Sequence, residues 1–316
     1  MIDNKNPLII IAGPTAIGKS DLAVKLARMI GGEIISADSM QVYKGMDIGT
    51  AKITNDEMLG IRHHLIDILD PSVDFSVADF KVMATKLIEE ICDRGNIPII
   101  AGGTGFYIQS VLYDIDFNDS ADSNLELRDE LSNIASEKGA KYLHDMLRAI
   151  DAKSADEIHE NNIKRVIRAI EYYKMTGEKI SEHNEKESQK VSPYNYCYFV
   201  IDDDRDKIYE RIDLRVDKMV ENGLIEEVKA LMEKGYSPDK NISMLGLSYK
   251  EIYDYLKGAC ELSEAIRLIK RDTRHFAKKQ LTWFKREKEV IWINRSSEDE
   301  MLAIIMDTLK NHNVIV

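Results

Sequence analysis

The sequence predicts an α/β protein: a doubly wound, mostly parallel sheet with an all-helical insertion domain. Short, uninterrupted apolar runs alternate with helical patterns near both ends of the chain, whereas the middle stretch has helical spacing alone. Such runs are typical of strands buried on both faces of a parallel sheet, whose neighbouring strands need helical crossovers. We therefore expect residues 1–116 and 191–316 to form the core and residues 117–190 the insertion.

Composition is that of an ordinary globular protein. The chain has 316 residues, of which 44% are hydrophobic and 31% charged, and this length allows a sizeable core. No apolar run approaches the roughly 20 residues that span a bilayer, and the polar residues 1–7 do not form a signal peptide. We expect a cytoplasmic protein without a membrane partner. The three cysteines lack metal spacing, which predicts reduced structural thiols.

The strongest motif follows the first apolar run, residues 8–12, and precedes a helical pattern that begins at Asp21 and stops at Gly31. It matches G-x-x-x-x-G-K-[ST] at every specified position and reads Gly13-Pro14-Thr15-Ala16-Ile17-Gly18-Lys19-Ser20. The backbone N–H groups of such a loop converge on a phosphate. Lys19 would reach the outer phosphate, and the Ser20 hydroxyl would bind Mg2+. The sheet is therefore predicted to be a P-loop NTPase-like core that binds a polyanion.

Two further predicted strands bring polar residues to the same edge of the sheet. Residues 33–37 are followed directly by Asp38, and residues 97–101 are followed by Gly102-Gly103-Thr104-Gly105. Ligands of open α/β sheets bind at the carboxyl ends of the strands, so both segments should stand beside the phosphate loop. Each has a structural alternative, because Asp38 could be a helix N-cap or turn residue and Thr104 an N-cap.

The connections between these strands have distinct characters. Residues 44–52 contain two glycines and predict an irregular loop over the site. The adjacent histidines His63 and His64 lack metal spacing, which favours hydrogen-bonded structural roles. A crossover helix is predicted from the capping residue Ser76 to Gly95, because its apolar residues share one helical face.

The predicted insertion, residues 117–190, has no proline and only two glycines, and its apolar residues recur at helical spacing. Lys164, Arg165 and Arg168 lie close together near the start of one of its predicted helices. This cluster is either an edge that contacts phosphates or a solvated charged face, and the spacing does not separate the two.

The remaining strands and helices complete the core. Residues 196–201 predict a strand, and the helix that begins at Asp206 carries Arg211 and Arg215 one turn apart. On spacing alone, surface pairing of these arginines with the nearby Asp213 and Asp217 is favoured over a catalytic role. Residues 289–294 predict a last strand before a closing helix.

A basic segment, residues 267–288, contrasts with the net charge of −12. It holds nine lysines and arginines against two acidic residues, with Phe276, Trp283 and Phe284 interleaved. Cations interleaved with aromatic rings are typical of nucleic-acid surfaces. We therefore expect Lys278 and Lys279 to contact RNA.

Several stretches together resemble the tRNA dimethylallyltransferases, and the resemblance runs from the phosphate loop to about Trp283. The stretches are residues 38–52, 62–67, 102–105, 271–274 and 278–283. This resemblance implies transfer of a dimethylallyl group from dimethylallyl diphosphate to N6 of adenosine-37, 3′ of the anticodon in tRNA, with release of diphosphate. The partners would be the tRNA anticodon stem-loop and dimethylallyl diphosphate, with Mg2+ as cofactor. No obligate protein partner is evident.

The resemblance also implies roles for individual residues. Asp38 would be the general base, and Thr104 and Arg215 would contact the diphosphate or the tRNA. The phosphate loop would hold the diphosphate leaving group. Contacts to the target base and to the RNA would come from Ser39, Met40, Gln41, Arg128, Asn161, Asn162, Ile163, Lys164 and Arg165.

The sequence departs from the family pattern at several positions. Ile17 stands where a small residue is common, Ser20 where threonine is common and Lys164 where arginine is frequent. Ser248 stands where a glycine is expected, and Leu245 where the residue is often polar. Two alternatives compete with the transferase hypothesis. A P-loop nucleoside or nucleotide kinase would bind ATP and transfer phosphate, and an RNA-binding protein with a degenerate nucleotide site would have no activity. Prenylation of free adenine nucleotides is disfavoured by the insertion and the basic segment.

Overall fold

The computed structural model describes residues 5–117 and 125–315, and its centre is a six-stranded sheet. The strand order is β3-β2-β4-β1-β5-β6, and every neighbouring pair in the described sheet is parallel. The strands are β1 (Pro7–Ala12), β2 (Gly32–Ala37), β3 (His63–His64), β4 (Ile97–Gly102), β5 (Asn195–Asp202) and β6 (Val290–Asn294). The predicted doubly wound parallel sheet is confirmed.

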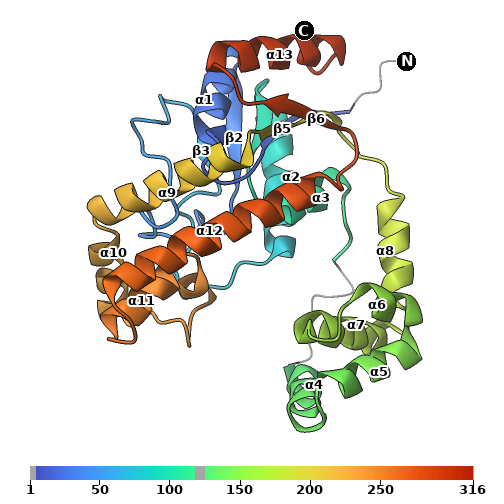
Figure 1. The fold of residues 1–316 in the computed structure, drawn as a ribbon. Helices are drawn as coiled ribbons and strands as arrows, with labels where there is room; N and C mark the ends of the chain where they lie inside the picture. Colours follow the sequence, from blue (N-terminus) through green and yellow to red (C-terminus); the bar gives the residue numbers. More distant parts are fainter. Residues whose placement is uncertain (1–4, 118–124, 316) are drawn as a thin grey trace. The chain divides into compact units, whose positions relative to one another are not determined.

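Contacts divide the chain into two compact units, residues 1–112 with 193–316, and residues 113–192. Helices of the first unit are α1 (Lys19–Ile30), α2 (Val77–Asp93), α3 (Gly105–Leu112), α9 (Arg205–Glu221), α10 (Leu224–Glu233), the 3-10 helix η2 (Ile242–Leu245), α11 (Tyr249–Leu256), α12 (Leu262–Phe284) and α13 (Glu298–Asn311). Helices of the second are α4 (Leu125–Lys138), α5 (Ala140–Ile150), α6 (Ala152–Glu157), α7 (Ile163–Thr176) and α8 (Ile180–Ser188) (Figure 1).

The sheet is buried on both faces, as the uninterrupted apolar runs require. Ile9 and Ile11 of β1 belong to a core cluster that includes side chains of α1, α9 and α13. The alternating residues Leu8 and Ile10 point to the opposite face and are equally inaccessible to solvent. Strands of this kind cannot alternate polar and apolar residues, because neither face meets water.

Within residues 5–117 and 125–315, two further cores lie away from the sheet. One joins Val42 and Met46 of the loop after β2 to buried side chains of α9, α10, α11 and α12. The other lies within the helical unit and packs Leu131, Leu143 and Ile170 of α4, α5 and α7 together. The helical unit therefore buries an apolar core of its own. Among the described residues, no helix is long and apolar enough to cross a membrane.

The strand order sets where a ligand can bind. β1 and β4 lie side by side in the sheet. From β1 the chain continues to β2, which lies beyond β4, and from β4 it continues to β5, which lies beyond β1. The connections that follow these two strands therefore run in opposite directions, and open α/β sheets bind ligands at such a point, at the carboxyl ends of the strands.

Candidate active site at the phosphate loop

The phosphate loop runs from the end of β1 into α1 with three residues at positive φ: Gly13 at 151°, Ala16 at 62° and Gly18 at 93°. Glycine is required at position 13, because an added Cβ would lie 2.7 Å from the carbonyl oxygen of Ile201. Ala16 adopts the left-handed conformation without being glycine, which costs about 1–3 kcal/mol and requires support from its surroundings.

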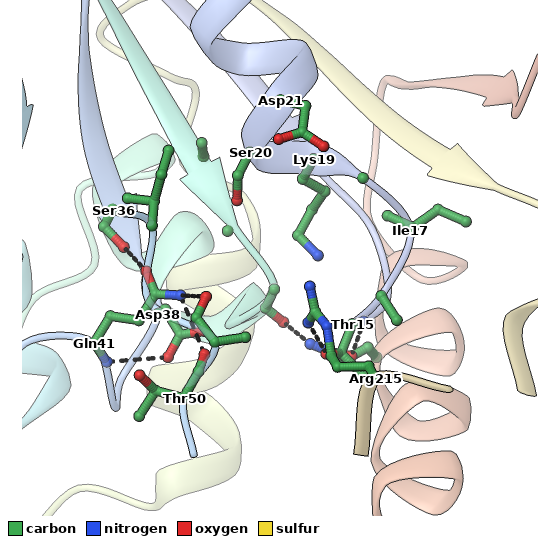
Figure 2. Close-up of a pocket in the computed structure, with 18 of the residues that line it drawn as sticks. Thr15, Ile17, Lys19, Ser20, Asp21, Ser36, Asp38, Gln41, Thr50 and Arg215 are labelled. Atoms are coloured by element: carbon green, nitrogen blue, oxygen red, sulfur yellow. Dashed lines mark hydrogen bonds between the residues drawn. The ribbon is translucent and has the colours of Figure 1, made fainter. Parts of the chain in front are cut away.

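Two arginines of α9 provide contacts to this loop. Nε of Arg211 donates to the carbonyl oxygen of Ala16 at 3.2 Å, and its guanidinium pairs with Asp203 at 2.9 Å. Nη1 of Arg215, one turn further on, donates to Oγ1 of Thr15 at 3.3 Å (Figure 2). The arginines on one face of α9 therefore approach the phosphate loop.

The predicted surface pairing of the two arginines with Asp213 and Asp217 is wrong. Asp213 accepts hydrogen bonds of 2.5 and 2.8 Å from Arg274 of α12. Asp217 pairs with Lys270 of the same helix at 2.6 Å. Asp213 and Asp217 thus connect α9 to α12, whereas Arg211 and Arg215 contact the phosphate loop. Which residues pair depends on how the two helices pack.

Lys19 lies in the pocket among several charged groups. Its Nζ donates to the carbonyl oxygen of Pro14 at 2.7 Å. Burial and the nearby Arg215 lower the pKa of Lys19 to about 7, although the charge of Asp38 acts in the opposite direction. Burial likewise lowers the pKa of Arg215, against the charge of Asp38. Lys19 and Arg215 therefore form a pair of like charges in a pocket that carboxylates also line, and a polyanion would neutralise this pair.

Asp38 stands directly after β2. Its Oδ1 accepts the backbone N–H groups of Met40 at 2.9 Å and of Gln41 at 3.4 Å, which makes it a turn residue. The same side chain lines the pocket and interacts electrostatically with Lys19 and Arg215. The two interpretations of Asp38 from sequence do not exclude each other, because the turn itself holds the carboxylate at the pocket.

Thr104 ends the segment after β4 and leads into α3. Its N–H donates to the carbonyl oxygen of Ala37 at 3.2 Å, and its carbonyl oxygen accepts from Tyr107 at 3.0 Å. Gly102 is packed so closely on Ala37 that an added Cβ would lie 2.2 Å from its carbonyl oxygen. The glycines therefore bring the ends of β2 and β4 together and place Thr104 near Asp38.

Gln280 of α12 connects the two strand-end loops. Its Oε1 accepts the N–H of Thr15 at 2.9 Å, and its Nε2 donates to the carbonyl oxygen of Gly103 at 3.0 Å. An added Cβ on Gly103 would lie 2.2 Å from that Nε2. Sequence reasoning missed this residue, because a glutamine that directly follows two lysines is typical of a solvated helix face. Its side chain is buried, and only the packing of α12 against both loops reveals its role.

Two adjoining cavities meet at these residues. The first, of about 210 Å³, is lined by the phosphate loop and by polar groups that include Ser36 and Gln41. The second, of about 250 Å³, has a more apolar lining that includes Met40, Val216 and Met219. Both are lined by Thr15, Asp38, Thr50, Arg215, Phe276 and Gln280. An anion site therefore adjoins an apolar chamber, with a carboxylate on their shared wall.

The other predicted RNA contacts lie outside these cavities, except that Ser39, Met40 and Gln41 line one or the other. Lys278 and Lys279 are exposed on α12. In the helical unit, Asn161, Asn162, Lys164 and Arg165 are exposed, and Ile163 is half-buried. Arg128 donates two hydrogen bonds, of 2.8 and 3.0 Å, to the fully buried Glu171, which anchors its guanidinium.

The backbone conformation at Ser248 explains why the family pattern favours glycine at this position. Its φ is 78°, in the left-handed region that side chains rarely adopt, and it lines the second cavity. The carboxylate of Glu251 accepts its backbone N–H at 2.9 Å at the start of α11. Leu245 is half-exposed, at 50%, so this departure lies at the surface.

The site offers Mg2+ a small set of protein ligands. No group of three or more histidine, cysteine, aspartate or glutamate residues lies together in the part of the chain that the structure describes. Ser20 is exposed at the pocket, near Asp21 and Glu57. Mg2+ commonly takes one or two protein ligands together with phosphate oxygens and water, so the Ser20 hydroxyl and a bound diphosphate form a suitable donor set.

Comparison with known proteins gives a consistent result. The model of a family described as IPP transferase matches residues 41–287. A tRNA dimethylallyltransferase of Lachnoclostridium phytofermentans is 55% identical over 304 residues, which cover 96% of each chain.

Two solved structures extend this comparison. The tRNA isopentenylpyrophosphate transferase of Bacillus halodurans is 45% identical, with a TM-score of 0.74 over 98% of this chain and 97% of that chain. A eukaryotic dimethylallyltransferase, described as acting on tRNA, is 29% identical, with a TM-score of 0.83 over 96% of this chain and 79% of that chain.

Proposed function

The chain belongs to the IPP transferase family, and we propose that it transfers a dimethylallyl group from dimethylallyl diphosphate to N6 of adenosine-37 in tRNA. The family membership confirms the resemblance read from the sequence motifs. The single observation that carries the proposed chemistry is the position of Asp38, on the wall shared by the polar cavity that contains Lys19 and Arg215 and the more apolar cavity.

Asp38 is proposed as the general base. The exocyclic amine of adenine is a poor nucleophile, because its lone pair is delocalised into the ring. The C–N bond forms as the C–O bond of the donor breaks, the electron pair of that bond leaves with the diphosphate, and an N6 proton passes to the Asp38 carboxylate. A base of this kind typically contributes about 10²–10⁴-fold to the rate.

The phosphate loop would stabilise the leaving group. Lys19, Arg215 and residues 15–20 of the phosphate loop line the polar cavity, so negative charge that grows on the diphosphate would meet two cations and the start of α1. The Ser20 hydroxyl would hold Mg2+, which would neutralise further charge on the diphosphate. Thr104, at the apolar cavity, is proposed to hydrogen-bond the diphosphate or the tRNA. In this reaction the phosphates are discarded, whereas a kinase would transfer one.

RNA binding is proposed for each unit separately. The target adenine must leave its stack to reach Asp38, as is common when proteins act on bases in RNA loops. In the first unit, Lys278 and Lys279 present exposed charge on α12. In the helical unit, the anticodon stem-loop is proposed to contact Arg128 and the exposed start of α7, residues 161–165. Such a reaction would take place in the cytoplasm, where tRNA is abundant.

A stem-loop assay tests the proposal. Labelled dimethylallyl diphosphate is incubated with an anticodon stem-loop that carries adenine 3′ of the anticodon, and with a matched stem-loop that carries guanine there. Label is expected in the first RNA only, with one diphosphate released per transfer. Equal label in both RNAs, or ATP turnover without transfer, would contradict the proposal and favour the alternatives.

Asp38→Asn separates catalysis from binding. The amide keeps the shape of the side chain but is a much weaker base, so transfer should fall by about 10²-fold or more while stem-loop affinity changes little. The control is Lys278→Ala combined with Lys279→Ala, which should weaken RNA binding in a salt-dependent way. A full rate in Asp38→Asn would remove this residue from the mechanism.

A further inference from the structure

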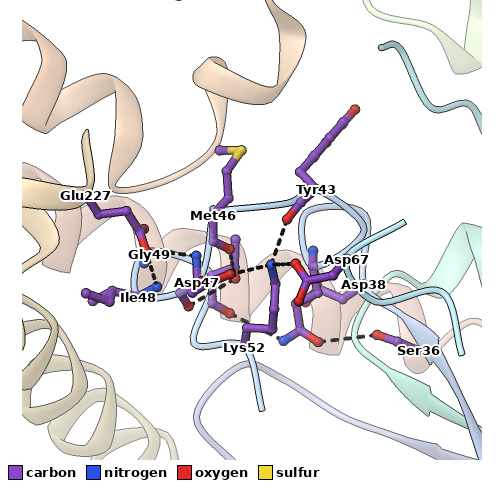
Figure 3. A network of polar contacts seen from close by, with 12 residues as sticks. Ser36, Asp38, Tyr43, Met46, Asp47, Ile48, Gly49, Lys52, Asp67 and Glu227 are labelled. Atoms are coloured by element: carbon purple, nitrogen blue, oxygen red, sulfur yellow. Dashed lines mark hydrogen bonds and ion pairs between the residues drawn. The ribbon is translucent and has the colours of Figure 1, made fainter. Parts of the chain in front are cut away.

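Residues 47–49, in the loop after β2, direct three consecutive backbone N–H groups at one carboxylate. Glu227 of α10 accepts the N–H of Asp47 at 2.9 Å, of Ile48 at 2.7 Å and of Gly49 at 3.0 Å (Figure 3). Successive N–H groups that converge in this manner form an anion-binding nest. Here the anion comes from the chain itself, from a helix about 180 residues away in sequence.

Tyr249, at the start of α11, completes this arrangement. Its hydroxyl donates to Oε1 of Glu227 at 2.7 Å, and its side chain is fully buried. Burial and the charge of Glu227 both raise the pKa of Tyr249, so the hydroxyl remains a donor. The ring packs directly on Gly49, where an added Cβ would lie 2.6 Å from Cζ. We call Glu227, Tyr249 and Gly49 the loop clamp.

The loop clamp is linked to the reaction site through the next residues of the loop. Nε2 of Gln41 donates to the carbonyl oxygens of Thr50 and Ala51, each at 3.4 Å. Gln41 lines the polar cavity together with Asp38, and Thr50 lines both cavities. Gly49 lines the apolar cavity. A displacement of residues 47–49 would therefore shift groups that face the proposed substrates.

A second anchor holds the same loop independently. Nζ of Lys52, whose side chain is only 4% exposed, donates to the carbonyl oxygen of Tyr43 and to Asp47, each at 2.6 Å. It also pairs with Asp67. Loss of the loop clamp should therefore release Ile48 and Gly49, while the side chain of Asp47 and the base of the loop stay attached to Lys52.

We infer that Glu227 is a positioning residue for prenyl transfer, which holds residues 47–49 so that Gln41 and Thr50 orient the acceptor base beside Asp38. The inference rests on the proposed function. Glu227 itself lines neither cavity, so its effect passes through the loop. The acceptor side should depend on it, whereas diphosphate binding at the phosphate loop should not.

The test compares Glu227→Gln with Glu226→Gln, an exposed neighbour on the same helix that loses the same charge. In Glu227→Gln the amide NH2 would face N–H donors. Hydrogen exchange of the amides of residues 47–49 should accelerate by about 10-fold or more. The kcat for prenyl transfer to the stem-loop should fall by about 10-fold or more, and the KM for dimethylallyl diphosphate should stay within about twofold. Glu226→Gln should match wild type in each measurement.

Each outcome decides the inference. Faster exchange with unchanged transfer would overturn the positioning role, and unchanged exchange would overturn the loop clamp. If Glu227→Gln does not fold, Tyr249→Phe replaces it as the test, because this change removes one hydrogen bond and keeps the ring on Gly49. Tyr249→Phe should lower kcat by about 3-fold. A wild-type rate in Tyr249→Phe would count against the inference. A wild-type protein without transfer activity would instead overturn the proposed function, and the positioning role with it.

Discussion

The phosphate loop and the loop of residues 38–53 line the same pair of cavities but are held by different means. In the phosphate loop, Gly13 and Gly18 provide positive φ angles, and side chains of distant elements form hydrogen bonds with Thr15 and Ala16. In the second loop, the conformation at residues 47–49 depends on Glu227 and Tyr249. The conformation of the phosphate loop thus depends largely on its own residues, whereas the loop that faces the proposed acceptor base is held by residues distant in sequence.

The largest expected effect comes from breaking the local loop. Gly13→Ala would place a Cβ 2.7 Å from the carbonyl oxygen of Ile201, so the loop must move. A displacement of about 1 Å at a reacting group costs about 10²-fold in rate, and transfer should fall by at least that much. The matched control is Gly45→Ala in the second loop, where φ is 71° but no atom lies within 4 Å of the added Cβ. If both variants lost activity equally, the local account of the phosphate loop would be wrong.

A smaller effect is expected at the residue that joins the phosphate loop to the β4 segment. Gln280→Ala leaves the N–H of Thr15 and the carbonyl oxygen of Gly103 without their partner. Loss of these hydrogen bonds should weaken the binding of dimethylallyl diphosphate by about 10-fold, as measured by calorimetry. Thr282→Ala, at an exposed site on the same helix, should leave binding unchanged. Equal affinities in the two variants would show that the phosphate loop needs no support from α12.

The smallest effect is a pH dependence of diphosphate binding. In the ligand-free protein, burial and the nearby Arg215 lower the pKa of Lys19 to about 7. A bound anion favours the charged amine, so above about pH 7 binding must take up a proton, and affinity should fall as pH rises. Below that pH, Lys19 is already charged and contributes no further change.

Calorimetry in buffers of different ionisation enthalpy would measure this proton uptake at pH 8. Arg215→Gln removes the neighbouring cation and should raise the pKa of Lys19, which moves the onset to higher pH and reduces the uptake at pH 8. An uptake equal in both proteins would contradict the assignment to Lys19.

Much of the fold could be predicted, because its strands are buried on both faces and their apolar runs are unambiguous. The short edge strand β3, at His63 and His64, was not predicted as a strand. Two residues carry no periodic pattern, and they pair with β2 only once the sheet exists. The histidines do have hydrogen-bonded roles, since His63 contacts the carbonyl oxygen of Ile61 and His64 contacts Glu33.

The candidate site likewise has parts that could be predicted from the sequence and parts that could not. The sequence by itself determined the phosphate loop, because eight consecutive residues specify its φ angles, its lysine and its hydroxyl. It also placed Asp38 and Thr104 at neighbouring strand ends, because parallel strands present their carboxyl ends at one edge. Only the tertiary structure decided the roles of Gln280 and Glu227. Each is a polar residue on a helix, where spacing predicts a solvated face, and its partners are brought to it by the packing of that helix.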